Sequence, residues 1–101
     1  MSSVREAIVE KKVNEFAKTL GILGYKNRGN AGQPDAIYHY KGGTVYIEFK
    51  QAHKKPRPLQ EHQMGKIRKQ RIPVYTVDDT EDGKNVLSKW VNDINAKGIF
   101  A

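Results

Sequence analysis

The sequence contains no cysteine among its 101 residues. Neither a disulfide framework nor a zinc site built on thiolates is therefore available. It also lacks an apolar run long enough to cross a bilayer, and its first residues carry no hydrophobic segment of a signal peptide. We therefore expect a protein of the cytoplasm that makes no membrane contact.

Acidic residues are few: 11 Asp and Glu stand against 18 Lys and Arg, which gives a formal net charge of +7. In so short a chain this excess favours a polyanionic partner, although a basic, well-solvated surface is the plainer explanation. No basic helix with a broad apolar face is present, so the pattern favours nucleic acid over an anionic membrane.

No internal repeat, low-complexity tract or linker divides the sequence, so we expect one domain over residues 1–101. Hydrophobic periodicity and breaker residues predict a mixed sheet flanked by helices, in the order α-β-β-β-α-β-α, which is an α/β fold. The expected helices cover residues 4–20, 58–70 and 80–95, and the expected strands cover residues 25–28, 36–40, 44–50 and 73–77.

Local signals support this order. Ser2 or Ser3 is placed to cap the first helix, and Gly21 is placed to end it. Lys41-Gly42-Gly43 indicates a hairpin turn, in which Gly42 and Gly43 can supply positive φ angles. The expected core residues of the three helices are Val9, Val13, Phe16 and Leu20, then Leu59, Met64 and Ile67, and last Val86, Leu87, Trp90, Val91 and Ile94.

A pattern of carboxylates and a lysine stands out in the middle of the chain. Asp35 follows Pro34, and Glu48 and Lys50 lie on the same face of the strand expected over residues 44–50, about 7 Å apart. Two carboxylates suit hard cations such as Mg²⁺ or Mn²⁺, and a nearby lysine can orient water and offset charge on a phosphate. The pattern therefore predicts a metal-dependent phosphodiester nuclease.

Plainer explanations exist for both carboxylates. Asp35 at the start of a strand is more often a turn residue that bonds to the backbone. A carboxylate such as Glu48 in an apolar strand costs several kcal/mol unless it is paired or metal-bound, and an ion pair with Lys50 would satisfy it.

The opposed strands would bring Asp35 and Glu48 together, and two further oxygen ligands are in reach of that position. The backbone carbonyl of Phe49 offers a neutral oxygen. Glu10 lies at the border of the apolar stripe of the first helix, with Glu6 one turn earlier on a similar azimuth.

These motifs resemble the PD-(D/E)XK nuclease superfamily and, more narrowly, the short, stand-alone, phage-type VRR-NUC domains. The resemblance covers most of residues 6–85, and the Pro-Leu-Gln start of the second helix makes it more specific than a lone PD…EXK. Its motifs are Glu10, Val13, Phe16 and Leu20-Gly21, then Gly32-x-Pro34-Asp35, Gly42-Gly43-x-Val45-x-x-Glu48-x-Lys50, Lys55-Pro56-x-Pro58-Leu59-Gln60 and Val74-x-x-Val77.

The resemblance implies a restriction-endonuclease-like core and metal ligation by Asp35 and Glu48, with catalysis by Lys50. It implies supporting roles for Glu10 and for Gln60, whose amide would bond a water or a phosphate; otherwise Gln60 is an ordinary residue of a helix start. Short family members are associated with cleavage of branched DNA, including four-way junctions resolved by homodimers, in bacterial or phage-infected cytoplasm.

Two residues depart from the family pattern. Gln33 stands where an apolar residue is usual, beside the proposed metal ligand. Arg71 stands where a glycine often ends the second helix. Neither change removes a catalytic group.

Cations flank the expected site. Phosphate contacts position nucleic acid without reading its sequence, and the residues best placed to make them are Arg28, Lys54, Lys55 and Arg57. We therefore expect an endodeoxyribonuclease that uses Mg²⁺ or Mn²⁺ on branched DNA, acting as a homodimer. A flap or nicking nuclease, an RNA nuclease and a non-catalytic DNA-binding module remain alternatives.

Overall fold

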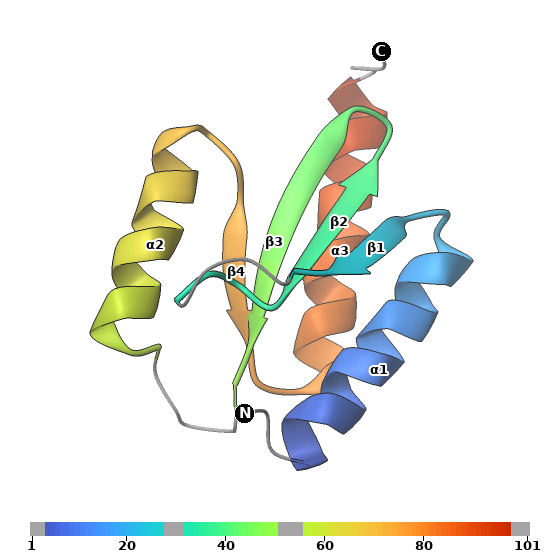
Figure 1. Ribbon diagram of the computed structural model, residues 1–101. Helices are drawn as coiled ribbons and strands as arrows, with labels where there is room; N and C mark the ends of the chain where they lie inside the picture. Colours follow the sequence, from blue (N-terminus) through green and yellow to red (C-terminus); the bar gives the residue numbers. More distant parts are fainter. Residues whose placement is uncertain (1–3, 28–31, 51–55, 98–101) are drawn as a thin grey trace.

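The computed structural model describes residues 4–27, 32–50 and 56–97. Its elements follow one another in the predicted order (Figure 1). They are α1 (Val4–Thr19), β1 (Leu23–Lys26), β2 (Ala36–Tyr40), β3 (Gly43–Phe49), α2 (Pro58–Lys69), β4 (Val74–Val77) and α3 (Thr80–Lys97).

The four strands form one sheet in the order β1-β2-β3-β4. The first three pair antiparallel, and β4 pairs parallel to β3. A parallel neighbour requires a crossover connection, which α2 provides between β3 and β4. The sheet is therefore mixed, as the sequence predicted.

The helices cover both faces of the sheet. Figure 1 shows α1 and α3 together on one side and α2 on the other. Alternate residues of β2 and β3 face the first side, where Tyr38, Val45, Ile47 and Phe49 are buried against α1 and α3. The intervening residues of β3 therefore face α2.

Most of the predicted core is confirmed. Val9 and Val13 of α1 and Leu87, Trp90 and Val91 of α3 are buried. Three expected core residues of these helices and Leu20, which follows α1, are partly buried and pack against the same cluster, and Ala17 also belongs to it. None of the described helices is long and apolar enough to span a bilayer.

Leu59 was wrongly predicted to be buried. Its side chain is 50% exposed, whereas Met64, five residues further along the same helix, is fully buried. Leu59 lies beside Gly32, where an added Cβ would come within 2.7 Å of its Cγ atom. It therefore covers the loop before β2 rather than the sheet.

The strand expected over residues 25–28 begins two residues earlier, at Leu23. All four residues of β1 are exposed, so burial gives no pattern from which to place this strand. Its position is set by pairing with β2, in which Leu23 lies opposite His39 and Lys26 opposite Ala36. The predicted caps Ser2 and Ser3 lie outside the described residues.

The hairpin turn lies within the predicted segment Lys41-Gly42-Gly43, but the positive φ angles belong to Lys41 and Gly42 rather than to the two glycines. Lys41 and Gly42 have φ angles of 44° and 83°, whereas Gly43 belongs to β3 and pairs with Tyr40. A two-residue turn with positive φ at both positions matches the twist of the strands. Gly43 is needed for another reason, because a Cβ there would come within 2.6 Å of Cδ1 of Ile94.

The ends of α1 and α2 both use the left-handed region. Gly21 ends α1 with a φ of 77°, as predicted. Arg71 follows α2 with a φ of 63°, and its N–H donates to the carbonyl oxygen of Arg68 at 2.9 Å. The arginine therefore adopts the conformation that glycine would favour, at a cost of about 1 kcal/mol.

Two helical glycines give opposite predictions for an added methyl group. A Cβ at Gly83 would lie 2.5 Å from Cγ2 of Val13, where α3 meets α1, whereas nothing lies within 4 Å at Gly65. We expect Gly83→Ala to lower the free energy of unfolding by about 1–3 kcal/mol. Gly65→Ala should raise it by about 0.5–1 kcal/mol, because alanine favours the helix. Urea denaturation of both variants checks this, and equal effects would contradict the packing described.

Candidate active site

The register of β2 and β3 places Asp35 across from Glu48. Ala36 pairs with Ile47, so one step beyond the last pair Asp35 stands opposite Glu48. Directly opposed residues of antiparallel strands point to the same face of the sheet. Asp35 and Glu48 therefore share the face covered by α2, and the opposed strands bring them together as the sequence predicted.

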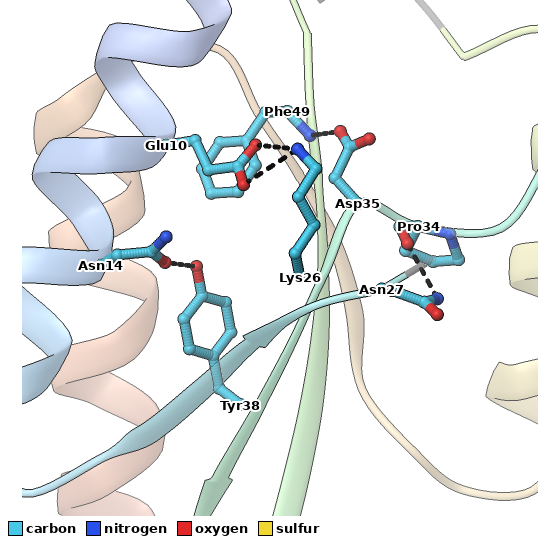
Figure 2. Close-up of polar contacts among 8 residues, drawn as sticks. All are labelled: Glu10, Asn14, Lys26, Asn27, Pro34, Asp35, Tyr38 and Phe49. Atoms are coloured by element: carbon cyan, nitrogen blue, oxygen red, sulfur yellow. Dashed lines mark hydrogen bonds and ion pairs between the residues drawn. The ribbon is translucent and has the colours of Figure 1, made fainter. Parts of the chain in front are cut away.

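Asp35 also takes part in the sheet. Its Oδ2 accepts a hydrogen bond from the backbone N–H of Phe49 at 2.9 Å (Figure 2). Its own carbonyl accepts one from the backbone N–H of Asn27 at 2.7 Å. Pro34 is opposite Phe49, one step beyond Asp35. Its carbonyl, the acceptor that a regular ladder would offer the Phe49 N–H, accepts from the Asn27 side chain at 2.9 Å instead. The side chain of Asp35 thus replaces the backbone where pairing ends, which fixes its orientation.

Glu48 is the most deeply buried carboxylate of the described residues, at 2% exposure. Its Oε2 accepts a hydrogen bond from Gln60 Nε2 at 2.7 Å and lies 3.3 Å from Lys50 Nζ. Its Oε1 is buried without a hydrogen-bond partner. A buried carboxylate oxygen without a partner is costly, so this atom is suited to accept a cation.

Gln60 is held by the start of α2. Its Oε1 accepts a hydrogen bond from the backbone N–H of Arg57 at 2.9 Å, so that its amide nitrogen is directed at Glu48. The sequence predicted that this amide contacts a water or a phosphate. In the structure Gln60 donates to the Glu48 carboxylate, and the contact with a water or a phosphate stays a prediction.

Lys50 lies just beyond β3. Its backbone N–H donates to the carbonyl of Val77 at 2.9 Å, which continues the parallel pairing with β4. Its side chain is 16% exposed and pairs with Glu48. This is the ion pair that the plainer explanation expects, and it leaves the ammonium at the edge of the same site.

The two buried carboxylates have raised pKa values. Burial, followed by the negative charge of Asp35, raises the pKa of Glu48 from its ordinary 4.5 to about 7, against the opposing effect of Lys50. Burial also raises the pKa of Glu10, against Lys26 and with a smaller contribution from Asp35. The charge of Asp35 is thus felt by both glutamates.

Glu10 does not join the other two carboxylates. It is 8% exposed, and its Oε1 and Oε2 lie 3.5 and 3.4 Å from Nζ of Lys26 on β1 (Figure 2). Across the described ranges, no three His, Asp or Glu side chains converge closely enough to hold a metal ion. The structure therefore brings Asp35, Glu48, Lys50 and Gln60 together and leaves Glu10 at the border.

The donor set nevertheless fits a hard divalent cation. It offers carboxylate oxygens of Asp35 and Glu48, including the unpartnered Oε1 of Glu48. The carbonyl of Phe49 points to the same strand edge as its N–H, which Asp35 accepts. All are oxygens, which Mg²⁺ and Mn²⁺ prefer.

Of the four residues expected to contact phosphate, the structure describes one. Arg57 precedes α2 and is exposed. Arg28, Lys54 and Lys55 lie outside the described residues. The prediction about these three cations therefore stays a prediction.

Two contacts beside the site were not predicted. Lys26 is the partner of Glu10, and Asn27 donates to the carbonyl of Pro34 at 2.9 Å and to Gln33 Oε1 at 3.4 Å. The unusual polar residue Gln33 thus has a polar partner. Both contacts depend on where β1 lies, and the available signal was that β1 pairs with β2, which begins immediately after Asp35.

No protein-family model matches the chain, and no curated protein matches it. The fold is similar to that of a solved structure described as "VRR_NUC domain", with a TM-score of 0.76 and 26% sequence identity. The similarity covers 85% of this chain and 97% of that one. It confirms the predicted resemblance to VRR-NUC domains and the predicted α/β fold with a mixed sheet flanked by helices.

Burial of Glu48 predicts an unusual dependence of stability on pH. A carboxyl whose pKa is higher in the folded state, here about 7 against 4.5, stabilises the fold below pH 4.5 and loses that contribution as the pH rises to about 7. With chelator present, the free energy of unfolding of Glu48→Gln, relative to that of the unchanged protein, should therefore rise by about 2 kcal/mol from pH 4.5 to pH 7. Urea denaturation from pH 4 to 8 measures the difference, and parallel curves for the two proteins would contradict it.

Proposed function

We propose, from its similarity in fold to a VRR_NUC domain, that the chain is a divalent-metal-dependent endonuclease that hydrolyses phosphodiester bonds in DNA. The observation that carries this proposal is the environment of Glu48. Its carboxylate is buried opposite Asp35 and held by Gln60 and Lys50, with one oxygen left without a partner. A binding surface alone has no need of such an arrangement.

Asp35, Glu48 and the Phe49 carbonyl would hold Mg²⁺ or Mn²⁺, with Glu10 as a further ligand, directly or through water. The cation supplies a Lewis acid that activates water and stabilises the departing oxyanion. Asp35 is oriented by its bond to Phe49 N–H, and Gln60 fixes the Glu48 carboxylate. These bonds keep the oxygens in position before substrate arrives.

Lys50 has two roles in this proposal. Its ammonium, 3.3 Å from Glu48 Oε2, offsets part of the negative charge of the carboxylates. Near a scissile phosphate, the same ammonium would orient the attacking water and oppose charge that builds on the phosphate oxygens. Its backbone is fixed by Val77, so the side chain starts from a defined position.

We propose branched DNA, with four-way junctions foremost, as the substrate, and a homodimer in the cytoplasm as the active form. A junction presents related phosphates, which a two-fold symmetric protein matches. The net charge of +7 supports a polyanionic partner. Arg57 and, in the segments before β2 and α2, Arg28, Lys54 and Lys55 would contact the phosphate backbone.

A non-catalytic DNA-binding module is the second candidate. The ion pair between Lys50 and Glu48 favours it, because that pair satisfies much of the buried charge without any metal. Flap and nicking nucleases differ from the main proposal in the geometry of the substrate only, and the chemistry is the same.

Three substitutions separate catalysis from binding. Asp35→Asn, Glu48→Gln and Lys50→Ala should each reduce cleavage by about 10³-fold or more, because each removes a charge from the reacting centre. Affinity for DNA in chelator should stay within about threefold. Lys89→Ala, at an exposed position on α3, is the control. Normal cleavage by Glu48→Gln would show that the proposed metal site is wrong.

Substrate preference is measured with labelled four-way junction, flap, nicked and linear duplex DNA, in Mg²⁺, Mn²⁺ or chelator. We expect symmetric paired cuts in the junction with either metal and no cleavage in chelator. Cutting of flaps or nicks would retain the chemistry and change the substrate. Tight binding without cleavage in any metal would favour the binding module.

A further inference from the structure

The ion pair between Lys26 and Glu10 joins two unequal partners. The side chain of Glu10 is 11% exposed, whereas that of Lys26 is 52% exposed. A half-exposed ammonium is hydrated without help, but a buried carboxylate requires a positive neighbour. The ion pair therefore stabilises the charge of Glu10 more than that of Lys26.

The amino group of Lys26 lies on the side of Glu10 that faces the site. Figure 2 draws it between the carboxylates of Glu10 and Asp35, and its distances to the two oxygens of Glu10 are nearly equal, 3.5 and 3.4 Å. A cation that took Glu10 as a ligand would need these same oxygens. Lys26 and the cation therefore compete for one carboxylate.

We propose that Lys26 is the counter-ion of Glu10 while no cation is bound, and that it must leave Glu10 when a divalent cation enters the site. This inference rests on the proposed function, because it takes Glu10 as a ligand. It makes Lys26 a positioning residue that sets the affinity for the metal. It also explains why Glu10 stands apart from Asp35 and Glu48 within the described part of the chain.

The structure provides space for this movement. A groove of about 530 Å³ runs beside α1, lined by six residues of that helix and by Lys26 of β1. Glu10 is on its wall together with Asn14 and Lys18. The ammonium of Lys26 can turn into this open groove and stay hydrated, so the exchange needs no rearrangement of the backbone.

Binding of Mn²⁺, followed by calorimetry, tests the proposal without any cleavage. Lys26→Met removes the competing charge and keeps the length of the side chain, so Mn²⁺ affinity should rise about fivefold. Melting in chelator should occur at a lower temperature than for the unchanged protein, because Glu10 loses its partner. Saturating Mn²⁺ should remove that difference.

Lys18→Met is the matched control. Lys18 lines the same groove and carries the same charge, and no ion pair is recorded for it among the described residues. Its Mn²⁺ affinity should stay within twofold of the unchanged protein. Lys26→Gln provides a second neutral variant if Lys26→Met folds poorly, and its affinity should rise in the same direction.

A double substitution identifies the route of the effect. In a Glu10→Gln background, Lys26→Met should give no gain in Mn²⁺ affinity, because there is no carboxylate left to release. A gain of equal size in that background would overturn the proposal in favour of a general charge effect. No gain from either neutral variant at Lys26, although Glu10→Gln weakens binding, would also overturn it.

Two further outcomes separate this proposal from the function on which it rests. If Mn²⁺ binds and Glu10→Gln leaves its affinity unchanged, Glu10 is not a ligand, and the proposal fails while the nuclease assignment stands. If the unchanged protein binds no Mn²⁺ at all, both fail together.

Discussion

The hydrogen bond from the backbone N–H of Phe49 to the carboxylate of Asp35 is the constraint on which the site depends. It forms where the ladder between β2 and β3 ends, because the carbonyl of Pro34, opposite Phe49, accepts from the Asn27 side chain instead. It holds Asp35 in register with Glu48 at the end of the hairpin. Without it the Asp35 side chain would be free to turn away from Glu48, although the Asp35 carbonyl would still be bound by the backbone N–H of Asn27.

The buried carboxylates at this end of the sheet each have a positively charged or hydrogen-bonding partner that offsets part of the cost of burial. Glu48 has Lys50 and Gln60 on one oxygen and nothing on the other, and Glu10 has Lys26. The partners of each carboxylate thus offset enough of the cost of burial for the protein to fold, but they do not offset all of it. Under the proposed function, a divalent cation would supply the missing positive charge and would replace part of the lysine contacts.

The sequence predicted the elements with strong patterns and missed what depends on tertiary placement. The alternation of Val45, Ile47 and Phe49 was enough to put Glu48 on the opposite face, and Asp35 followed from the hairpin register. The weakly patterned β1 was placed two residues late, so the contact of Lys26 with Glu10 was not foreseen. Leu59 was misplaced because helical spacing does not tell which neighbour covers a residue.

The parallel pairing of β3 with β4 orders the assembly of the site during folding. The β2–β3 hairpin joins segments close in sequence, so its closure costs little chain entropy, and it already sets Asp35 opposite Glu48. Gln60, in contrast, lies in the crossover helix, whose position is fixed only when β4 joins the sheet. The carboxylates thus come together in an early local step, and the amide that holds one of them arrives with the slow, non-local step.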